Sequence, residues 1–492
     1  MAVWRRGWIL LLTALLPAVL GGCMLSASPE DLYALPQLPE EYESLSAQLS
    51  EVLSAGAEYA APQAGGNLPP VQMKDLDGDG VDEVLAFFRI NSEDRPLKIY
   101  IFRAQGDDYV QAALIDGAGT SFHSVRYEDM DGDGIQEIIV SWRVSAEVQA
   151  LSVYSVKNLE PVQLMTSSYA RYEVVDLDGD DDLELVVVRS DETEAGLSLA
   201  DYYDWDSGKS ALQLQSTARL SASVATIRWM QAGSLQEGER AVFITARDAG
   251  ADETSRAITD ILACRQSQLT NIVLSSDTGF TTQIARFLNL PPADVNGDGA
   301  TEVPRPAELP SEPGEDPYWK IYWYCYSADG SDQLQAVTYH NQADNWYLLI
   351  PEEWDGRFTV RQSNASSAVH ATTFYSVRGR SPGEELLTIY TLTGTDRETQ
   401  AAKSSAAGRI RSMPSPTARA TTNGTTPWSG PWWRRASSPS RSSGAWGRIS
   451  ARLTGRRRAG QCPPLHPVYG NNPSKRLFKI SPAHVLAAYF PP

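Results

Sequence analysis

The sequence contains few of the residues on which most catalytic and zinc-binding motifs depend. Four of its 492 residues are cysteines, too few for a disulfide-dense scaffold. Its five histidines stand in no zinc or nucleophile motif; they are His123, His340, His370, His466 and His484. The motifs GxSxG and HExxH and a glycine-rich phosphate loop are absent as well. We therefore expect no catalytic and no organic-cofactor-binding residues, and a protein that is not an enzyme.

Acidic residues are missing from one part of the chain only. Residues 1–398 hold all 61 Asp and Glu against 27 Lys and Arg, a formal charge of −34. Residues 399–492 hold 15 basic residues and no acid, a charge of +15. The acidic body argues against nucleic acid as a partner, because phosphate binding needs a basic surface. A hydrophobic fraction of 42% is enough to build cores, and the length predicts about two to four domains.

The basic tail, residues 399–492, is also poor in aliphatic residues. Between positions 401 and 460 only Ile410, Ile449 and Leu453 are Ile, Leu or Val, among 11 Arg and 11 Ser. Such a segment buries too little apolar surface to offset the entropy of ordering, so it is predicted to be disordered. Two origins stay open. The tail is either a genuine arm that binds anionic wall polymer or membrane, or the product of a frameshift in a GC-rich gene.

The N-terminus has the features of an export signal. Arg5 and Arg6 precede the apolar stretch Trp8–Leu20, which is shorter than the ~20 residues of a membrane span. The run Leu20-Gly21-Gly22-Cys23 resembles a bacterial lipobox, which implies that residues 1–23 are a signal peptide and that Cys23 is lipidated. The chain is then anchored at the outer face of the cytoplasmic membrane by its acyl chains. An ordinary cleaved signal and a short anchor helix are the alternatives.

Residues 24–65 form a predicted tether with one helix. Apolar residues recur at helical spacing in this segment, at Tyr42, Leu45, Leu49, Val52 and Leu53. The spacing predicts an amphipathic helix over residues 39–55 that packs on the next domain and stops near Gly56. Residues 60–70 are rich in proline and glycine and indicate a linker.

One acidic loop occurs four times. The copies are Asp75–Glu83, Asp129–Glu137, Asp176–Glu184 and Asp294–Glu302, with oxygen-bearing side chains at loop positions 1, 3, 5 and 9. Calcium takes six to eight oxygen ligands in a flexible shell, and glycine tolerates the positive φ that a tightly curled loop needs. Ligation by oxygen alone favours calcium or magnesium over zinc. An acidic turn without an ion is the alternative, and four matching copies argue against it.

These loops differ from EF-hands. The EF-hand needs Glu at position 12 and flanking helices. Position 12 is Ala86, Val140, Val187 or Arg305, and apolar β-rich segments follow the first three loops. The loops are therefore predicted to lie between strands. The third copy has Asp181 where the others have glycine, which strains a positive-φ position.

The loops mark a longer repeat. Their first residues are 54, 47 and 118 residues apart, and the doubled interval predicts a hidden copy near residues 231–239 that has lost its acidic ligands. About 20 residues after each loop comes a second β-like element: Leu97–Phe102, Leu151–Val156, Leu199–Trp205, Ile258–Cys264 and Trp319–Tyr326. Each unit of about 50 residues suits a small antiparallel meander, as in a propeller blade or a solenoid turn.

Residues 66–335 resemble FG-GAP or VCBS repeats, the calcium-loop blades of integrin-type β-propellers. The resemblance rests on the DxDGDGxxE loops, and it implies a mainly β, propeller-like array of about five four-stranded blades, each stiffened by Ca²⁺. Five units are fewer than the usual seven, and one lacks ligands. The implied calcium ligands are Asp75, Asp77, Asp79, the Val81 carbonyl and Glu83; Asp129, Asp131, Asp133, Ile135 and Glu137; Asp176, Asp178, Asp180, Asp182 and Glu184; and Asp294, Asn296, Asp298, Ala300 and Glu302.

Residues 336–398 resemble a small α+β module of surface lipoproteins from Gram-positive bacteria. The aromatic residues around its start either fill the core at the module junction or stack on sugar rings. They are Tyr318, Trp319, Tyr322, Trp323, Tyr324, Trp346 and Trp354.

The function expected from these features is non-catalytic. The chain is predicted to be a lipid-anchored, extracytoplasmic calcium-binding repeat protein that presents a surface to a protein, a cell-wall polymer or a glycan. The alternative is a surface polysaccharide hydrolase or lyase on a propeller scaffold.

Overall fold

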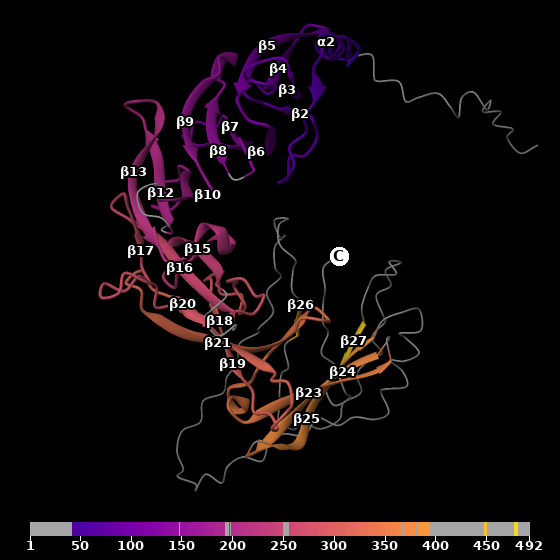
Figure 1. Ribbon diagram of the computed structural model, residues 1–492, viewed down its shortest axis with the longest axis vertical. Coiled ribbons are helices and arrows are strands. Elements are labelled where there is room, and N and C mark those ends of the chain that lie inside the picture. Colours follow the sequence, from indigo (N-terminus) through magenta and orange to yellow (C-terminus); the bar gives the residue numbers. More distant parts are fainter. Residues whose placement is uncertain are drawn as a thin grey trace, which may run out of the picture. The chain divides into compact units, whose positions relative to one another are not determined.

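The computed structural model describes residues 42–146, 148–191, 196, 198–248, 255–366, 369–379, 381–392, 447–449 and 477–480. The signal segment and Cys23 lie outside these ranges. By their internal contacts the residues form two compact units: unit 1 is Met1–Glu128 with Gly134–Thr166, and unit 2 is Asp129–Asp133 with Ser167–Pro492. Each unit consists mainly of β-strands (Figure 1). No helix in the described ranges is both long and apolar enough to cross a membrane.

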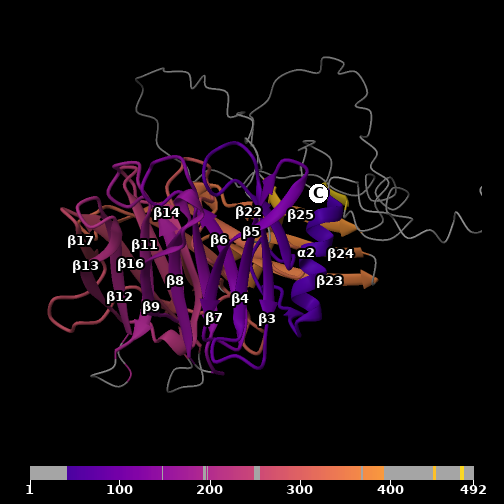
Figure 2. The ribbon, with the colours of Figure 1, turned by 90° about the horizontal axis from the view of Figure 1, so that it is seen from above.

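The first helix of unit 1 is α2 (Glu43–Ser54), which confirms the amphipathic helix predicted over residues 39–55; residues 39–41 of that range lie outside the described residues. Leu45 is buried against the first sheet, and the Ser44 hydroxyl accepts a hydrogen bond from the Tyr109 amide at 3.0 Å. Figures 1 and 2 both show the helix beside that sheet. It ends at Ala55 and Gly56, where glycine adopts a φ of +98°.

The strands of unit 1 form two antiparallel sheets. The order in the first sheet is β1-β3-β4-β5, with β2 paired to β3 beyond the end of β1, and the order in the second is β6-β7-β8-β9. The strands of the first sheet are β1 (Glu58–Tyr59), β2 (Val71–Lys74), β3 (Glu83–Arg89), β4 (Leu97–Gln105) and β5 (Asp108–Gly117). Those of the second are β6 (Ser121–Glu128), β7 (Glu137–Arg143), β8 (Gln149–Ser155) and β9 (Val162–Ser168).

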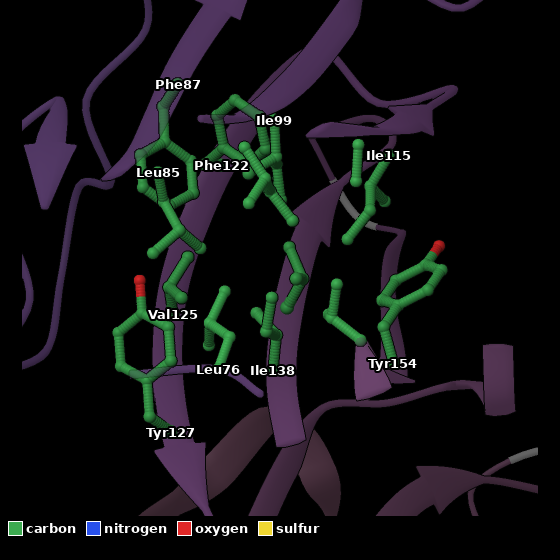
Figure 3. Packing of buried hydrophobic residues seen from close by; sticks show 14 of the residues in the cluster. Leu76, Leu85, Phe87, Ile99, Ile115, Phe122, Val125, Tyr127, Ile138 and Tyr154 are labelled. Carbon is green, nitrogen blue, oxygen red and sulfur yellow. The ribbon is translucent and has the colours of Figure 1, made fainter. Parts of the chain in front are cut away.

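The apolar run of β3 is buried on both faces of its sheet. Because side chains alternate along a strand, Val84, Ala86 and Phe88 face α2. Leu85 and Phe87 point the other way, into a core shared with Phe122, Val125 and Ile138 of the second sheet, as Figure 3 shows. Each such large side chain contributes about 1.5–3 kcal/mol by leaving water. This core fixes the ends of the strands from which the acidic loops depart.

The described strands of unit 2 form four sheets. Their orders are β10-β11-β12-β13, β14-β15-β16-β17 with β18 on β16, β19-β20-β21-β22-β26, and β23-β24-β25-β27. The third sheet contains β10 (Arg171–Val175), β11 (Glu184–Ser190), β12 (Ser198–Asp206) and β13 (Ala211–Leu220), and the fourth contains β14 (Ile227–Ser234), β15 (Arg240–Asp248), β16 (Arg256–Arg265), β17 (Gln268–Asn271) and β18 (Ile284–Arg286). The fifth contains β19 (Val303–Glu308), β20 (Trp319–Tyr326), β21 (Asp332–Asn341), β22 (Trp346–Leu349) and β26 (Gly447–Ile449), and the sixth contains β23 (Phe358–Ser366), β24 (Val369–Arg378), β25 (Ser381–Leu392) and β27 (Leu477–Ile480).

Successive sheets of unit 2 share cores in the same way. On β15, Val242 and Ile244 face the third sheet, whereas Phe243 packs with Val303 of the fifth. Trp346 and Phe374 belong to the core between the fifth and sixth sheets. The predicted second element of every repeat is a strand: β4, β8, β12, β16 and β20. The hidden repeat is confirmed as β14 and β15, joined by a turn over residues 235–239.

The prediction of an α+β module over residues 336–398 is wrong. Strand β21 runs across residue 336, and β23, β24 and β25 form a further four-stranded sheet with β27. The helical content of the described part of 336–398 is one 3₁₀ turn, Glu352–Trp354. The reason is the alternation of apolar and polar residues in these segments, which suits a half-buried strand and not a helix. Trp323, Trp346 and Trp354 are at most 3% exposed, so these three fill cores as one alternative predicted.

Two short segments of the tail, which was predicted to be disordered, form strands. Strand β26 pairs with the edge of β22 in parallel, and β27 pairs with the edge of β25 antiparallel. An edge strand offers a row of unpaired N–H and C=O groups, and a segment of almost any composition can satisfy them through its backbone. Composition therefore did not reveal these strands. The rest of residues 399–492 lies outside the described ranges.

Candidate metal centres

Three of the acidic loops join two paired antiparallel strands of one sheet. The first connects β2 to β3, the second β6 to β7 and the third β10 to β11. The fourth leads directly into β19, and its ends are joined by an isolated bridge between Ala293 and Glu302. The predicted position next to strands is thus confirmed. An EF-hand would need helices in their place.

The backbone has a positive φ at the same two positions in all four loops. Positions 4 and 6 have φ values between +68° and +95°, a region that glycine enters without steric cost. The third loop keeps this conformation with Asp181 at φ +76°, so the strain expected there is present. The residues concerned are Gly78 and Gly80, Gly132 and Gly134, Gly179 and Asp181, and Gly297 and Gly299.

The aspartate at position 1 holds this curl. Asp75 accepts hydrogen bonds from the amides of Gly78 (2.8 Å) and Gly80 (2.9 Å), one at each carboxylate oxygen. Asp294 accepts the two equivalent bonds at 2.6 and 3.1 Å. Each carboxylate oxygen has further acceptor capacity, which remains for a cation.

The residue at position 2 anchors each loop to the core. These side chains are apolar and at most 4% exposed; they are Leu76, Met130, Leu177 and Val295. In three loops the amide of the same residue donates to the glutamate at position 9, at 2.9 Å for Glu83, 2.6 Å for Glu184 and 2.9 Å for Glu302. The glutamate is therefore fixed by one oxygen, and its other oxygen is turned toward the loop.

Glu184 gives the clearest sign of a missing ligand. The residue is fully buried, and its Oε1 has no hydrogen-bond partner among the described residues. A buried carboxylate oxygen without a partner destabilises the fold, because it has lost its hydrogen bonds to water and has formed no other interaction. A divalent cation coordinated by oxygen would compensate it.

Acidic side chains converge in every loop. In each of four groups the potential ligand oxygens lie within 4.8 Å of one another. The groups are Asp75, Asp77 and Glu83; Asp129, Asp131 and Glu137; Asp176, Asp178, Asp180 and Glu184; and Asp294, Asp298 and Glu302. Asp79 and Asp133 are exposed and lie outside these groups, and Asn296 hydrogen-bonds to Glu302 in the fourth. The carbonyl ligands predicted at Val81, Ile135, Asp182 and Ala300 stay a prediction.

The electrostatics agree with cation binding. Burial, and then the charges of the neighbouring aspartates, raise the pKa of Glu184 to about 8 and the pKa values of Glu83 and Glu302 to about 7. An ordinary glutamate ionises far below neutral pH. The raised pKa values mean that nothing positive near these carboxyl groups compensates their ionised form. The donors are all oxygens, which suits Ca²⁺ or Mg²⁺ and not zinc. Such an ion would supply charge compensation and rigidity to the loop, and these residues would hold it.

One pair of titratable groups was not found from the sequence. His370 on β24 and Asp344, in the turn between β21 and β22, lie 2.8 Å apart (Nδ1 to Oδ1). Asn341 donates to the other oxygen of Asp344 at 3.0 Å. The two residues are 26 positions apart on different sheets, and nothing in the local sequence signals their contact. Neither residue belongs to one of the four groups of potential metal ligands found among the described residues.

Comparisons with known proteins bear on part of the chain. No curated protein matches the sequence. The crystal structure of rhamnogalacturonan lyase YesW aligns with 69% of this chain at 13% sequence identity and a TM-score of 0.29, and the alignment spans 61% of that protein. Residues 75–140, which include the first two acidic loops, match the family model of the FG-GAP-like repeat.

Proposed function

We propose that this chain is a non-catalytic, calcium-stabilised repeat protein, anchored outside the cytoplasmic membrane, that presents a binding surface to a partner. The observation that carries the proposal is the third loop. There the unpartnered buried oxygen of Glu184 stands among the oxygens of Asp176, Asp178 and Asp180. The other three loops repeat the same backbone and most of the same donors.

The role proposed for calcium is structural. Three loops connect strands that contribute to cores shared by neighbouring sheets, and the fourth leads into β19, so an ion in a loop would stiffen the link between core and surface. The FG-GAP-like match over residues 75–140 supports treating the sheets as blades of a propeller-like array. Repetition of blades creates a broad surface made of loops, which is typical of binding proteins.

The proposed location rests on the sequence around Cys23. Lipid at this residue would hold the chain at the outer face of the membrane, and the helix α2 would dock the tether on the first sheet. The partners proposed are a protein, a cell-wall polymer or a glycan; the acidic body disfavours nucleic acid.

Calorimetry on the purified chain tests the calcium proposal. Calcium should raise the melting temperature relative to a chelator, because a ligand of the folded state stabilises it by mass action. Glu184→Gln should reduce this shift. Glu239→Gln is the matched control, since Glu239 occupies position 9 of the turn that lacks acidic ligands. An unchanged melting temperature with no bound ion by elemental analysis would overturn the proposal.

A further inference from the structure

A cavity of about 240 Å³ opens beside the fifth sheet of unit 2. It lies between the segment after β18, the start of β20, the end of β21 and the strand β23. Its lining includes Leu288 and Leu290 from the first of these, Tyr318 and Trp319 from the second, Gln342 from the turn after β21 and Gln362 from β23. No acidic loop contributes to it, so the cavity is separate from the metal centres.

Apolar side chains form the floor of the cavity, and they are packed in a buried core. Leu290 and Ile321 are at most 3% exposed and belong to one small core with Trp323. Trp319 is only partly buried, and the guanidinium of Arg286 lies 4.4 Å from its ring centre. This cation–π contact fixes the indole plane. The partly buried Trp319 ring therefore borders the cavity while it also packs against this core.

The rim carries neutral hydrogen-bonding groups. The side-chain amide of Gln362 donates to the Tyr339 hydroxyl at 3.0 Å, and its backbone amide donates to the Tyr318 hydroxyl at 3.3 Å. These bonds orient both hydroxyls at the cavity wall. Gln342 is exposed at the rim and adds a second side-chain amide. Amides and hydroxyls both donate and accept, so they match ligands that carry several hydroxyl groups.

The lining carries no formal charge. It contains no Asp, Glu, Lys or Arg. Its one histidine, His340, is stacked on Tyr347 with ring centres 5.0 Å apart, and burial lowers its pKa to about 3, so it stays neutral. None of the lining side chains would pair with an ionic ligand, and the Arg286 guanidinium beside the cavity lies against the Trp319 ring.

We propose that this cavity binds a neutral pyranose unit of a glycan. A pyranose has an apolar C–H face that packs on an aromatic ring and an edge of hydroxyls that satisfies amides. An apolar peptide side chain would fill the floor but leave the rim groups desolvated and unpaired. The inference rests on the proposed function, since it names the class of ligand presented to the repeat surface.

Binding is measured on the full chain in calcium, by titration calorimetry and tryptophan fluorescence. The neutral probes are cellohexaose, mannohexaose and chitohexaose; hexagalacturonate is the charged comparison and a leucine-rich peptide the apolar one. At least one neutral probe should bind, and Trp319→Ala should weaken it roughly tenfold or more by removing the stacking surface. Trp205→Ala, a partly buried tryptophan of the third sheet, is the matched control and should leave binding unchanged.

Failure of this inference is distinguishable from failure of the calcium proposal. If calcium raises the melting temperature but no neutral probe binds, the cavity assignment is overturned and the calcium role stands. Binding of hexagalacturonate or the peptide with equal or higher affinity overturns it as well. If Trp319→Ala lowers the melting temperature of the ligand-free protein, the test uses Gln342→Ala instead. The Gln342 side chain is exposed and supports no core, so its loss should leave the fold intact. Unaltered affinity in that variant contradicts the assignment.

Discussion

The carboxylate of Asp182 lies directly on the backbone of Gly132. A Cβ placed on Gly132 would stand 2.3 Å from Oδ1 of Asp182. In unit 1, Ile135 has the same relation to Gly78, with 3.1 Å between that glycine's hypothetical Cβ and Cγ1. The side chain at position 7 of one loop thus covers the glycine at position 4 of the loop before it. In these two loops the glycine at position 4 therefore accommodates a close approach in addition to a positive φ, whereas nothing lies within 4 Å of a Cβ at Gly179 of the third loop.

Replacement of Gly132 should therefore cost more than replacement of Gly134. Both have positive φ, so alanine at either is strained by about 1–2 kcal/mol. No atom lies within 4 Å of a Cβ at Gly134, whereas Gly132→Ala must also displace Asp182. We expect a lower free energy of unfolding for Gly132→Ala, measured by urea denaturation. Adding Asp182→Ala should bring the cost of Gly132→Ala down to that of Gly134→Ala. Equal costs in the single variants would contradict the packing argument.

The calcium-free protein should lose stability as pH rises. The folded-state pKa values of Glu83 and Glu302, about 7, and of Glu184, about 8, lie above the ordinary 4.5. Between pH 4.5 and 8 the folded state therefore binds more protons than the unfolded state, and stability present at low pH is lost across this window. Calcium needs the ionised form, so its stabilising effect should grow over the same range.

Calorimetry with chelator and with calcium, at half-unit steps from pH 5 to 8.5, measures both trends. The triple variant Glu83→Gln, Glu184→Gln, Glu302→Gln is the control, and its calcium-free stability should vary less with pH. A calcium-induced shift in melting temperature that is equal at pH 5 and pH 8 would refute the linkage.

The sequence predicted the clustering of acidic side chains in the loops better than it predicted the sheet built from residues 358–392. The loops are local: spacing alone places Asp75, Asp77 and Glu83 in one curl. Alternating apolar and polar residues in segments such as β24 suit a strand, but the assembly of these strands into a sixth sheet is set by long-range contacts that no local pattern shows. The contact of Asp182 with Gly132 was out of reach for the same reason. It joins two loops that are 50 residues apart in the sequence, and their proximity is set by tertiary packing, not by either loop's own spacing.

Removal of one ligand should remove one ion. Asp77→Ala and Asp131→Ala each eliminate a member of a different acidic group, so each should lower the calcium content by about one ion per chain. Elemental analysis after exhaustive exchange into calcium buffer gives the stoichiometry. Asp107→Ala, an exposed residue in the turn between β4 and β5, should leave the content unchanged. Loss of ions in this control, or retention of the full content in both loop variants, would argue against independent loop sites.

Membrane attachment should depend on the thiol of Cys23. Acyl chains contribute about 0.8 kcal/mol per buried CH₂, so two or more chains hold a protein firmly. The chain expressed in a bacterial host should enter the membrane fraction and incorporate labelled palmitate. Cys23→Ser should abolish both, whereas Cys264→Ser, a buried thiol of the fourth sheet, should not. Palmitate incorporation into Cys23→Ser would exclude this anchor.

The fourth sheet, which has no acidic loop, is tied to the third by a buried carboxylate. Asp260 on β16 is fully buried, and one of its oxygens accepts the amides of Ser221 and Ala222, both at 2.8 Å. Its other oxygen accepts from the Asn271 side chain at 2.8 Å. Burial raises the pKa of Asp260, and these three donors oppose that rise. Three direct hydrogen bonds thus use both oxygens of this carboxylate at the link between the two sheets.

Asp260→Ala should therefore destabilise the protein to the same extent with calcium and with chelator. The substitution leaves two backbone amides and one side-chain amide buried without acceptors, a loss of about 2–4 kcal/mol. Urea denaturation in both buffers measures it. Asp248→Ala on β15 removes an exposed ion pair with Arg256 and should cost less than about 1 kcal/mol. If the cost of Asp260→Ala disappeared when calcium was added, an ion and not the hydrogen-bond network would hold the fourth sheet to the third.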